Sequence, residues 1–218
     1  MFCYPVIIEQ TKDWIDYLQA IASLIVAGCA VSALHTWWKE FVGKKKIEFA
    51  AEFVEKAIDM KEFIAYVRNG FSLANEEEDI ENELKKENKY IPNGKTSYLT
   101  PKYRIKEKED DIRNFYSLKT KALMYFSEDA LKIYSVVSSI IIKIKISSDE
   151  LYRGSCYSHL KDEKVKQDME IIWSSYSSDD KIAQEIERAV EELKLNLEPL
   201  YQDKTFKWKN LKDCFLER

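Results

Sequence analysis

The stretch Tyr17–Trp38 reads YLQAIASLIVAGCAVSALHTWW and has no Lys, Arg, Asp or Glu, although charged residues make up 33% of the 218-residue chain. As an α-helix these residues would extend about 33 Å, which matches a hydrocarbon layer about 30 Å thick. A buried helix of a soluble protein usually carries charge along one side and rarely runs this far without it. The stretch therefore predicts one transmembrane helix over residues 17–38, with membrane lipid as its partner.

The residues on either side of this stretch agree with a span and predict its direction. Trp14 and Tyr17 stand at one end and Trp37 and Trp38 at the other, where amphipathic rings favour the membrane interface. The carboxyl side is basic and the amino side is acidic; the residues concerned are Lys39, Lys44, Lys45 and Lys46 against Glu9, Asp13 and Asp16. The positive-inside tendency then places residues 1–16 outside and residues 39–218 in the cytoplasm, beneath the inner (plasma) membrane. A cleaved signal peptide would need a positive amino-terminal region, and this one is acidic.

Small residues within the span predict self-association. Ser23 and Ala27, and Gly28 and Ser32, are four residues apart, a spacing that lets helix backbones approach closely in lipid. Two interpretations stay open, a tight seam between passive anchors and a narrow pore. The residues expected to line the seam or pore are Gln19, Ser23, Ala27, Gly28 and Ala30. His35, Trp37 and Trp38 are expected to form the gate or an interfacial contact.

The rest of the chain predicts a cytoplasmic helical domain, so that the fold class is all-α. Glycine and proline are few, and apolar residues recur at helical spacing. Helices are expected to continue from the span to Asn69-Gly70, and then over Asp110–Ser147, Glu163–Tyr176, Ser177 to just before Pro199, and the end of the chain. The segment SVVSSIIIKIKISS could alternatively form a strand. Residues 76–108 are expected to hold a charged loop, which a short charged helix can precede, because periodicity is lost and Pro92-Asn93-Gly94 interrupts them.

Basic and aromatic residues alternate in the second half of that loop. Such residues can hold phosphates and stack on bases, which makes a nucleotide or oligonucleotide the candidate ligand. The residues are Lys95, Tyr98, Lys102, Tyr103 and Arg104. Because glutamates are interspersed, a solvated loop is the alternative interpretation.

No motif of an enzyme occurs in the chain. Phosphate-binding glycine loops, metalloprotease, hydrolase and kinase signatures are all missing, so neither catalytic residues nor a cofactor are expected. Four widely spaced cysteines indicate neither a metal site nor a disulfide framework. Cys156 and His159 are close in sequence, but a buried thiol beside a surface histidine is the simpler interpretation.

An acidic amino-terminal segment, a small-residue span ending in HTWWKEF and a helical domain of about 180 residues together resemble a known class of proteins. These are the single-span membrane effectors of bacterial anti-phage defence systems of the CBASS and Hailong type. The resemblance implies a homo-oligomeric effector that conducts ions or disrupts the membrane, controlled by a nucleotide ligand and a nucleotidyltransferase partner. A passive membrane-anchored module that recruits a cytoplasmic protein is the alternative.

Overall fold

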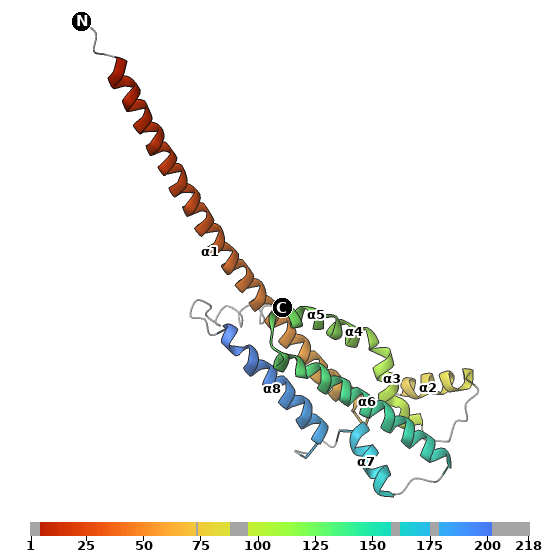
Figure 1. Ribbon diagram of the computed structural model, residues 1–218. Helices are drawn as coiled ribbons and strands as arrows, with labels where there is room; N and C mark the ends of the chain where they lie inside the picture. The colour runs from red at the N-terminus through yellow and green to blue at the C-terminus, as the bar shows by residue number, and fades with distance from the viewer. Residues whose placement is uncertain (1–4, 73, 88–95, 158–161, 175–178, 202–218) are drawn as a thin grey trace. The chain divides into compact units, whose positions relative to one another are not determined.

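The computed structural model describes residues 5–72, 74–87, 96–157, 162–174 and 179–201, and every regular element in these ranges is helical (Figure 1). No strand occurs among them, so the all-α prediction is confirmed. The alternative strand at SVVSSIIIKIKISS is wrong, because these residues lie within a helix.

The first helix, α1, runs from Pro5 to Val67. Proline suits the first turn of a helix, where its missing N–H has no partner to lose. The helix ends just before Asn69 and Gly70, as the sequence predicts. The chain divides into two compact units, Met1–Glu48 and Phe49–Arg218, and α1 contributes residues to both.

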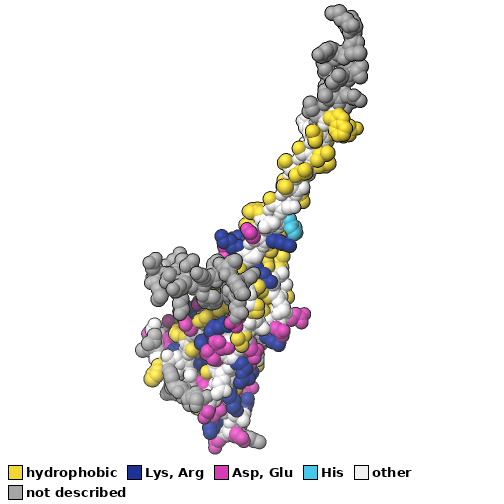
Figure 2. All heavy atoms as spheres, turned by 90° about the vertical axis from the view of Figure 1, so that its left-hand side faces the viewer, with side chains coloured by type: hydrophobic (Ala, Val, Ile, Leu, Met, Phe, Trp, Pro, Cys, Tyr) yellow, Lys and Arg dark blue, Asp and Glu magenta, His cyan; other side chains and the backbone are white. Residues whose placement is uncertain are grey.

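In unit 1, Met1–Glu48, α1 carries exposed apolar side chains (Figure 2). Those of Leu24, Val26 and Val31 are between 68% and 74% exposed. Near the carboxyl end of the predicted span the Trp37 and Phe41 rings stack, with their centroids 5.5 Å apart.

Unit 2, Phe49–Arg218, is built on α6, which packs against α7, α8, α3 and α5. Figure 1 shows α8 running back alongside α6. The helices that follow α1 are α2 Ala74–Lys86, η1 Thr96–Leu99, α3 Thr100–Glu107, α4 Glu109–Ser117, α5 Lys119–Tyr125, α6 Glu128–Tyr157, α7 Asp162–Ile172 and α8 Lys181–Tyr201.

An aromatic cluster joins α1 to α6 within unit 2. Phe53 is fully buried, and its ring lies 5.4 Å from the Tyr134 ring of α6 and 6.1 Å from that of Phe126. Phe49 stacks on Phe126 at 5.6 Å. Large buried rings of this kind contribute much of the hydrophobic stabilisation of a domain this size.

The predicted helix Asp110–Ser147 is wrong as one element, because the structure divides it into α4, α5 and the first part of α6. Phe126 takes an extended conformation, with φ −125° and ψ 163°, between α5 and α6. The break lets the Phe126 ring stack on both Phe49 and Phe53. Tertiary packing therefore outweighs the helical periodicity of the sequence here.

Two further boundaries differ from the predictions. In residues 76–108, α2 agrees with the short charged helix allowed by the prediction, but the described residues after it form η1 and α3 where a loop was predicted. Helix α8 continues through Pro199 to Tyr201 instead of ending before it. Proline removes the hydrogen bond to Leu195, four residues earlier, and Leu195 is 64% exposed, so water can satisfy the freed carbonyl. The predicted last helix lies outside the described residues.

Candidate functional site: an exposed apolar helix and a buried arginine junction

The amino-terminal helix is long and apolar enough to cross a membrane. This follows from its length and composition, in the part of α1 from Asp16 onward. None of the residues in the most apolar window is buried within the chain. A stretch of this kind exposes a large apolar surface, which in a soluble monomer would be unusual.

Helix geometry separates the residues predicted to form the seam or pore. At about 100° per residue, Gln19, Ser23, Ala27 and Ala30 share one side of α1. Gly28 falls roughly opposite Gln19 on the same count. The five residues therefore do not form a single stripe.

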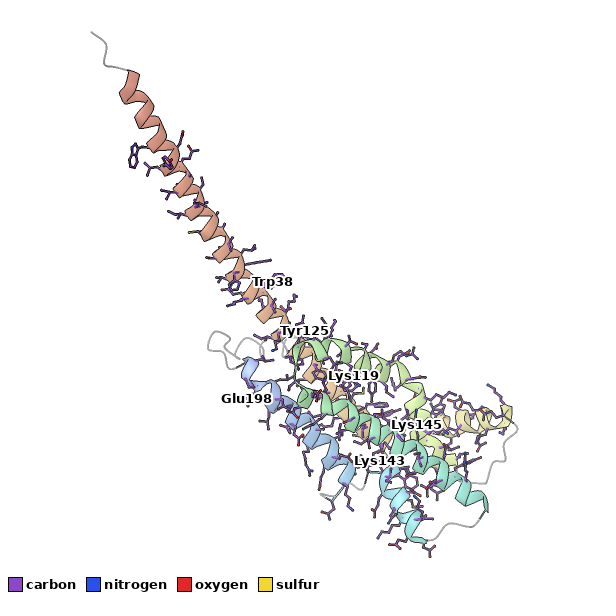
Figure 3. All side chains as sticks on the ribbon, viewed as in Figure 1. Trp38, Lys119, Tyr125, Lys143, Lys145 and Glu198 are labelled. Carbon is purple, nitrogen blue, oxygen red and sulfur yellow. The ribbon has the colours of Figure 1, made fainter. Side chains whose placement is uncertain are left out.

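The predicted gate residues also fall on different sides of α1. Trp37 lies in line with Gln19, because eighteen residues make five full turns, whereas His35 is on the side of Gly28. Trp38 is about 100° from Trp37. All three side chains are exposed; Trp38 is labelled in Figure 3. A gate on the Gln19 side would thus contain Trp37 and not His35.

Two hydroxyl groups in this stretch are satisfied by the helix itself. Ser23 Oγ donates to the Gln19 carbonyl at 2.8 Å, and Thr36 Oγ1 donates to the Ser32 carbonyl at 3.0 Å. Such bonds to the carbonyl four residues earlier remove the need for an outside partner. The Gln19 carboxamide differs, because it has no hydrogen-bond partner among the described residues.

In unit 2, Arg104 of α3 is buried and uses all five of its N–H groups. Nε and Nη2 donate to the two Glu76 carboxylate oxygens at 2.8 and 2.9 Å. The remaining donors reach the carbonyls of Tyr66 at 3.1 Å, Asn69 at 2.8 Å and Phe71 at 2.7 Å. Because the last carbonyls of a helix have no partner within it, Arg104 caps the carboxyl end of α1.

Arg68, just after α1, does the same for α7. It donates to the carbonyls of Glu170, Ile171 and Trp173 at 2.9, 2.9 and 3.1 Å. Its Nη1 also donates to Asp180 Oδ1 at 2.9 Å, and this oxygen accepts the Ala183 N–H at 3.0 Å at the start of α8. We call the two arginines with Glu76 and Asp180 the arginine junction; all four side chains are buried.

The junction joins the end of α1 to four other helices of unit 2. Arg104 brings in α3 and Glu76 brings in α2, while Arg68 connects α7 with the start of α8. Ions buried in this way are stable only when paired and fully hydrogen-bonded, and breaking such a pair is strongly destabilising. The end of α1 is thereby held rigidly in the unit.

The predicted ligand residues are engaged in contacts within the chain. Arg104 belongs to the junction, Lys102 binds Asp149 at 2.6 Å, and Tyr103 donates to Asp79 at 3.3 Å. The Tyr98 ring lies 5.6 Å from the Trp173 ring. Lys95 lies outside the described residues. Arg104 is 2% exposed, so a ligand could reach it only by displacing Glu76.

Burial and hydrogen bonding shift the pKa values of two side chains in unit 2. Burial raises the pKa of the Tyr66 phenol, and the Arg104 guanidinium, 5.0 Å from its ring centroid, opposes that rise. Hydrogen bonds to Glu150 and then to Asp168 raise the pKa of Lys164. Both shifts stabilise the form present at neutral pH.

Sequence reasoning missed Arg68, Glu76 and Asp180. Glu76 and Asp180 lie in charged stretches that look like ordinary surface, and Arg68 is a single charge after an apolar run. Nothing in the spacing of these residues distinguishes a buried ion pair from a solvated one. Asp180 accepts the Ala183 N–H at the start of α8, as a capping residue does, but its pairing with Arg68 depends on a contact between residues 112 positions apart.

No arrangement for metal binding was found: among the described residues, no group of three or more His, Cys, Asp or Glu side chains could hold a metal ion. His159 and the side chain of Cys156 lie outside the described residues. The interpretation of these two as a buried thiol beside a surface histidine therefore stays a sequence hypothesis.

Comparison with protein-family models, with curated proteins and with solved structures found no match. The class of the protein therefore follows from its own residues. It is an all-α protein with one amino-terminal helix long and apolar enough to span a membrane, and a helical unit tied to the end of that helix by buried arginines.

Proposed function

We propose that the chain is an oligomeric membrane effector, with a narrow pore formed by its spans and gated by unit 2. In this proposal the amino terminus is outside and unit 2 is in the cytoplasm of a bacterial cell. The role in anti-phage defence, with a nucleotide signal from a nucleotidyltransferase, comes from the resemblance in layout described above. The direction of the span comes from the acidic residues before it and the lysines after it.

The observation that carries the proposal is the carboxamide of Gln19 within Tyr17–Trp38, the uncharged stretch of α1. An amide placed in hydrocarbon without a partner costs roughly 2 to 7 kcal/mol. Gln19 has no partner among the described residues, so a second copy of the span or a file of water would have to supply one. Ser23, Ala27 and Ala30, small residues on the same side, allow close approach of other copies.

The arginine junction supports coupling between the span and a ligand-responsive unit. An anchor that only tethers a domain does not require the end of its helix to be bound by buried charges. In an effector, by contrast, a shift of α1 must be transmitted to the other helices. The contacts of Arg68 and Arg104 provide such a connection at the end of α1.

The first experiment determines whether the chain is inserted in the membrane and on which side of it unit 2 lies. Cells expressing the full chain are lysed without detergent, and the membrane fraction is washed with alkaline carbonate. We expect the chain to remain in the pellet, and protease added outside intact cells to leave unit 2 uncut. Recovery of the intact chain in the supernatant would remove the basis of the whole proposal.

The second experiment tests the pore with a membrane-potential dye in expressing cells. Gln19→Leu should abolish depolarisation, whereas Thr36→Leu, a matched polar-to-leucine change about 100° around α1 from Gln19, should leave it intact. The comparison assumes that the two variants reach the membrane in equal amounts, which is checked in the carbonate pellet. No depolarisation of the unaltered chain under any triggering condition, or equal behaviour of both variants, would contradict a pore.

A second candidate is a passive anchored module that recruits a cytoplasmic protein. It is favoured by the internal pairing of Lys102, Tyr103 and Arg104, which leaves these residues of the expected ligand set engaged. A fragment starting at Lys44 distinguishes the candidates. A recruiting module retains its partner affinity as a soluble fragment, whereas an effector loses all activity.

A further inference from the structure

The short helix α5 exposes two apolar side chains beside two lysines. Leu123 is 57% exposed and Met124 is 78% exposed, although both belong to a seven-residue helix inside unit 2. Lys119 and Lys121 lie one turn earlier in the same helix. We call these four residues the α5 surface.

The two lysines are not neutralised by carboxylates in the described part of the chain. Lys119 Nζ lies 5.9 Å from the centroid of the Tyr134 ring, and Lys121 Nζ lies 5.9 Å from that of Phe49. The acidic residues nearest in sequence are Asp111, Glu128 and Asp129, each at least seven residues away, and Asp129 is paired with Lys132 at 2.7 Å. The helix itself carries two positive charges and no negative one.

The α5 surface lies at the end of unit 2 where α1 enters it. Tyr125, the residue after Met124, packs on Phe49 with ring centroids 5.7 Å apart (Figure 3). Phe49 is the first residue of unit 2. In sequence it follows the Trp38 that ends the predicted span by only eleven residues.

This chain length limits the distance between α5 and the bilayer for any orientation of the two units. Eleven residues measure about 17 Å as a helix and at most about 40 Å when extended. The lysine-rich stretch Lys44–Lys46 lies within the same eleven residues. Electrostatic attraction to charged lipids falls off over about 10 Å. The lysines of α5 can therefore reach the lipid headgroups across the helical separation of about 17 Å when the span tilts or their side chains extend.

We infer that the α5 surface docks on anionic phospholipid of the leaflet next to unit 2, with Lys119 and Lys121 on the headgroups and Leu123 and Met124 in the layer beneath them. Exposed apolar residues flanked by lysines are the pattern of a helix that lies at a membrane interface. Each lysine near an anionic surface should favour the docked state roughly fivefold. The inference rests on the proposed function, because the bilayer is beside α5 only if the span is inserted.

Oxidation of Met124 provides the test, since hydrogen peroxide converts an accessible thioether to the sulfoxide and is itself reduced to water. The full-length chain is reconstituted in nanodiscs of phosphatidylcholine, alone or mixed with phosphatidylglycerol, and sulfoxide is followed by mass spectrometry. Met60, which is 3% exposed, is the internal control and should react slowly in both. We expect Met124 to react at least about fivefold more slowly in the anionic discs, and high salt to remove the difference.

A charge-reversal pair separates docking from a general charge effect. Lys119→Glu with Lys121→Glu should restore fast oxidation of Met124 in anionic discs. Lys145→Glu with Lys166→Glu, the same charge change on exposed residues of α6 and α7, should leave the slow rate unchanged. Unchanged reactivity of Met60 in all variants shows that the fold is retained.

The outcomes that overturn the inference can be told apart from failure of the proposed function. Equal oxidation of Met124 in neutral and anionic discs, with the chain still in the discs, overturns the docking and leaves the span intact. Protection that depends on protein concentration and not on lipid charge means that a second copy covers α5, and it also overturns the docking. A chain that does not co-migrate with discs overturns both proposals.

Discussion

Replacement of Arg104 by methionine should remove a large part of the stability of unit 2. The side chain is 2% exposed and fills five hydrogen bonds, two of them to a carboxylate that is itself buried. Methionine keeps much of the apolar volume but leaves Glu76 without its guanidinium partner, and three carbonyls lose a donor. Removing one partner of a buried ion pair costs about 3 to 5 kcal/mol.

This loss is large compared with the 5 to 15 kcal/mol that stabilises an ordinary domain. For a chain of this length it corresponds to a fall in Tm of roughly 10 °C. The assay is urea and thermal unfolding of the full chain in detergent micelles, followed by far-UV circular dichroism. The span stays helical in the micelle, so the cooperative change reports unit 2.

Lys102→Met is the matched control, because Lys102 is on the same helix but its pair with Asp149 is exposed. Exposed pairs contribute at most about 1 kcal/mol. The double variant Glu76→Met with Arg104→Met should recover about 2 kcal/mol relative to Arg104→Met alone, since no buried carboxylate is left unpaired. A loss below about 1 kcal/mol for Arg104→Met, or the same loss for Lys102→Met, would refute the structural role assigned to Arg104.

Two further predictions concern single sites in unit 2. The Tyr134 hydroxyl is buried without a partner among the described residues, so Tyr134→Phe should be neutral or slightly stabilising at pH 7. Burial also raises the pKa of the Tyr134 phenol. The stability that this shift provides is complete below about pH 10 and falls by up to about 1.4 kcal/mol per pH unit as the pH rises further. Urea titrations at alkaline pH should show this loss for the unaltered chain and not for Tyr134→Phe. A Cβ at Gly70 would meet the Trp173 ring at 3.9 Å, an ordinary contact, and its φ is not left-handed, so Gly70→Ala should keep Tm within a few degrees or raise it. A fall of more than about 1 kcal/mol at neutral pH for either variant would contradict these assignments.

Apolar residues at helical spacing predicted the helices that depend only on residues close together in the sequence. The apolar residues that recur at helical spacing in α8 are buried, including Ile182, Ile186, Val190 and Leu193. The helical class also followed from few glycines and prolines and from 3.6-residue periodicity. These features are visible in a single sequence because a helix repeats its environment every turn.

Helix boundaries were less predictable where distant residues decide them. The break at Phe126 depends on Phe49 and Phe53, and no neighbouring residue signals it. The partial helix in the charged segment 76–108 depends on Arg104, whose buried pair with Glu76 ties α3 to α2. Charge runs look alike in sequence whether water or a guanidinium solvates them.

By itself, the sequence determined that this chain has one helix long and apolar enough for a bilayer, because length and the lack of charge are local properties. Only the tertiary structure decided which charges are buried. Of the 34 Lys and Arg residues, Arg68 and Arg104 are buried because they donate hydrogen bonds to carbonyls at the ends of helices. The physical reason is that an ion is stable in the interior only where carbonyls and carboxylates from distant segments converge on it, and that convergence exists only in the folded chain.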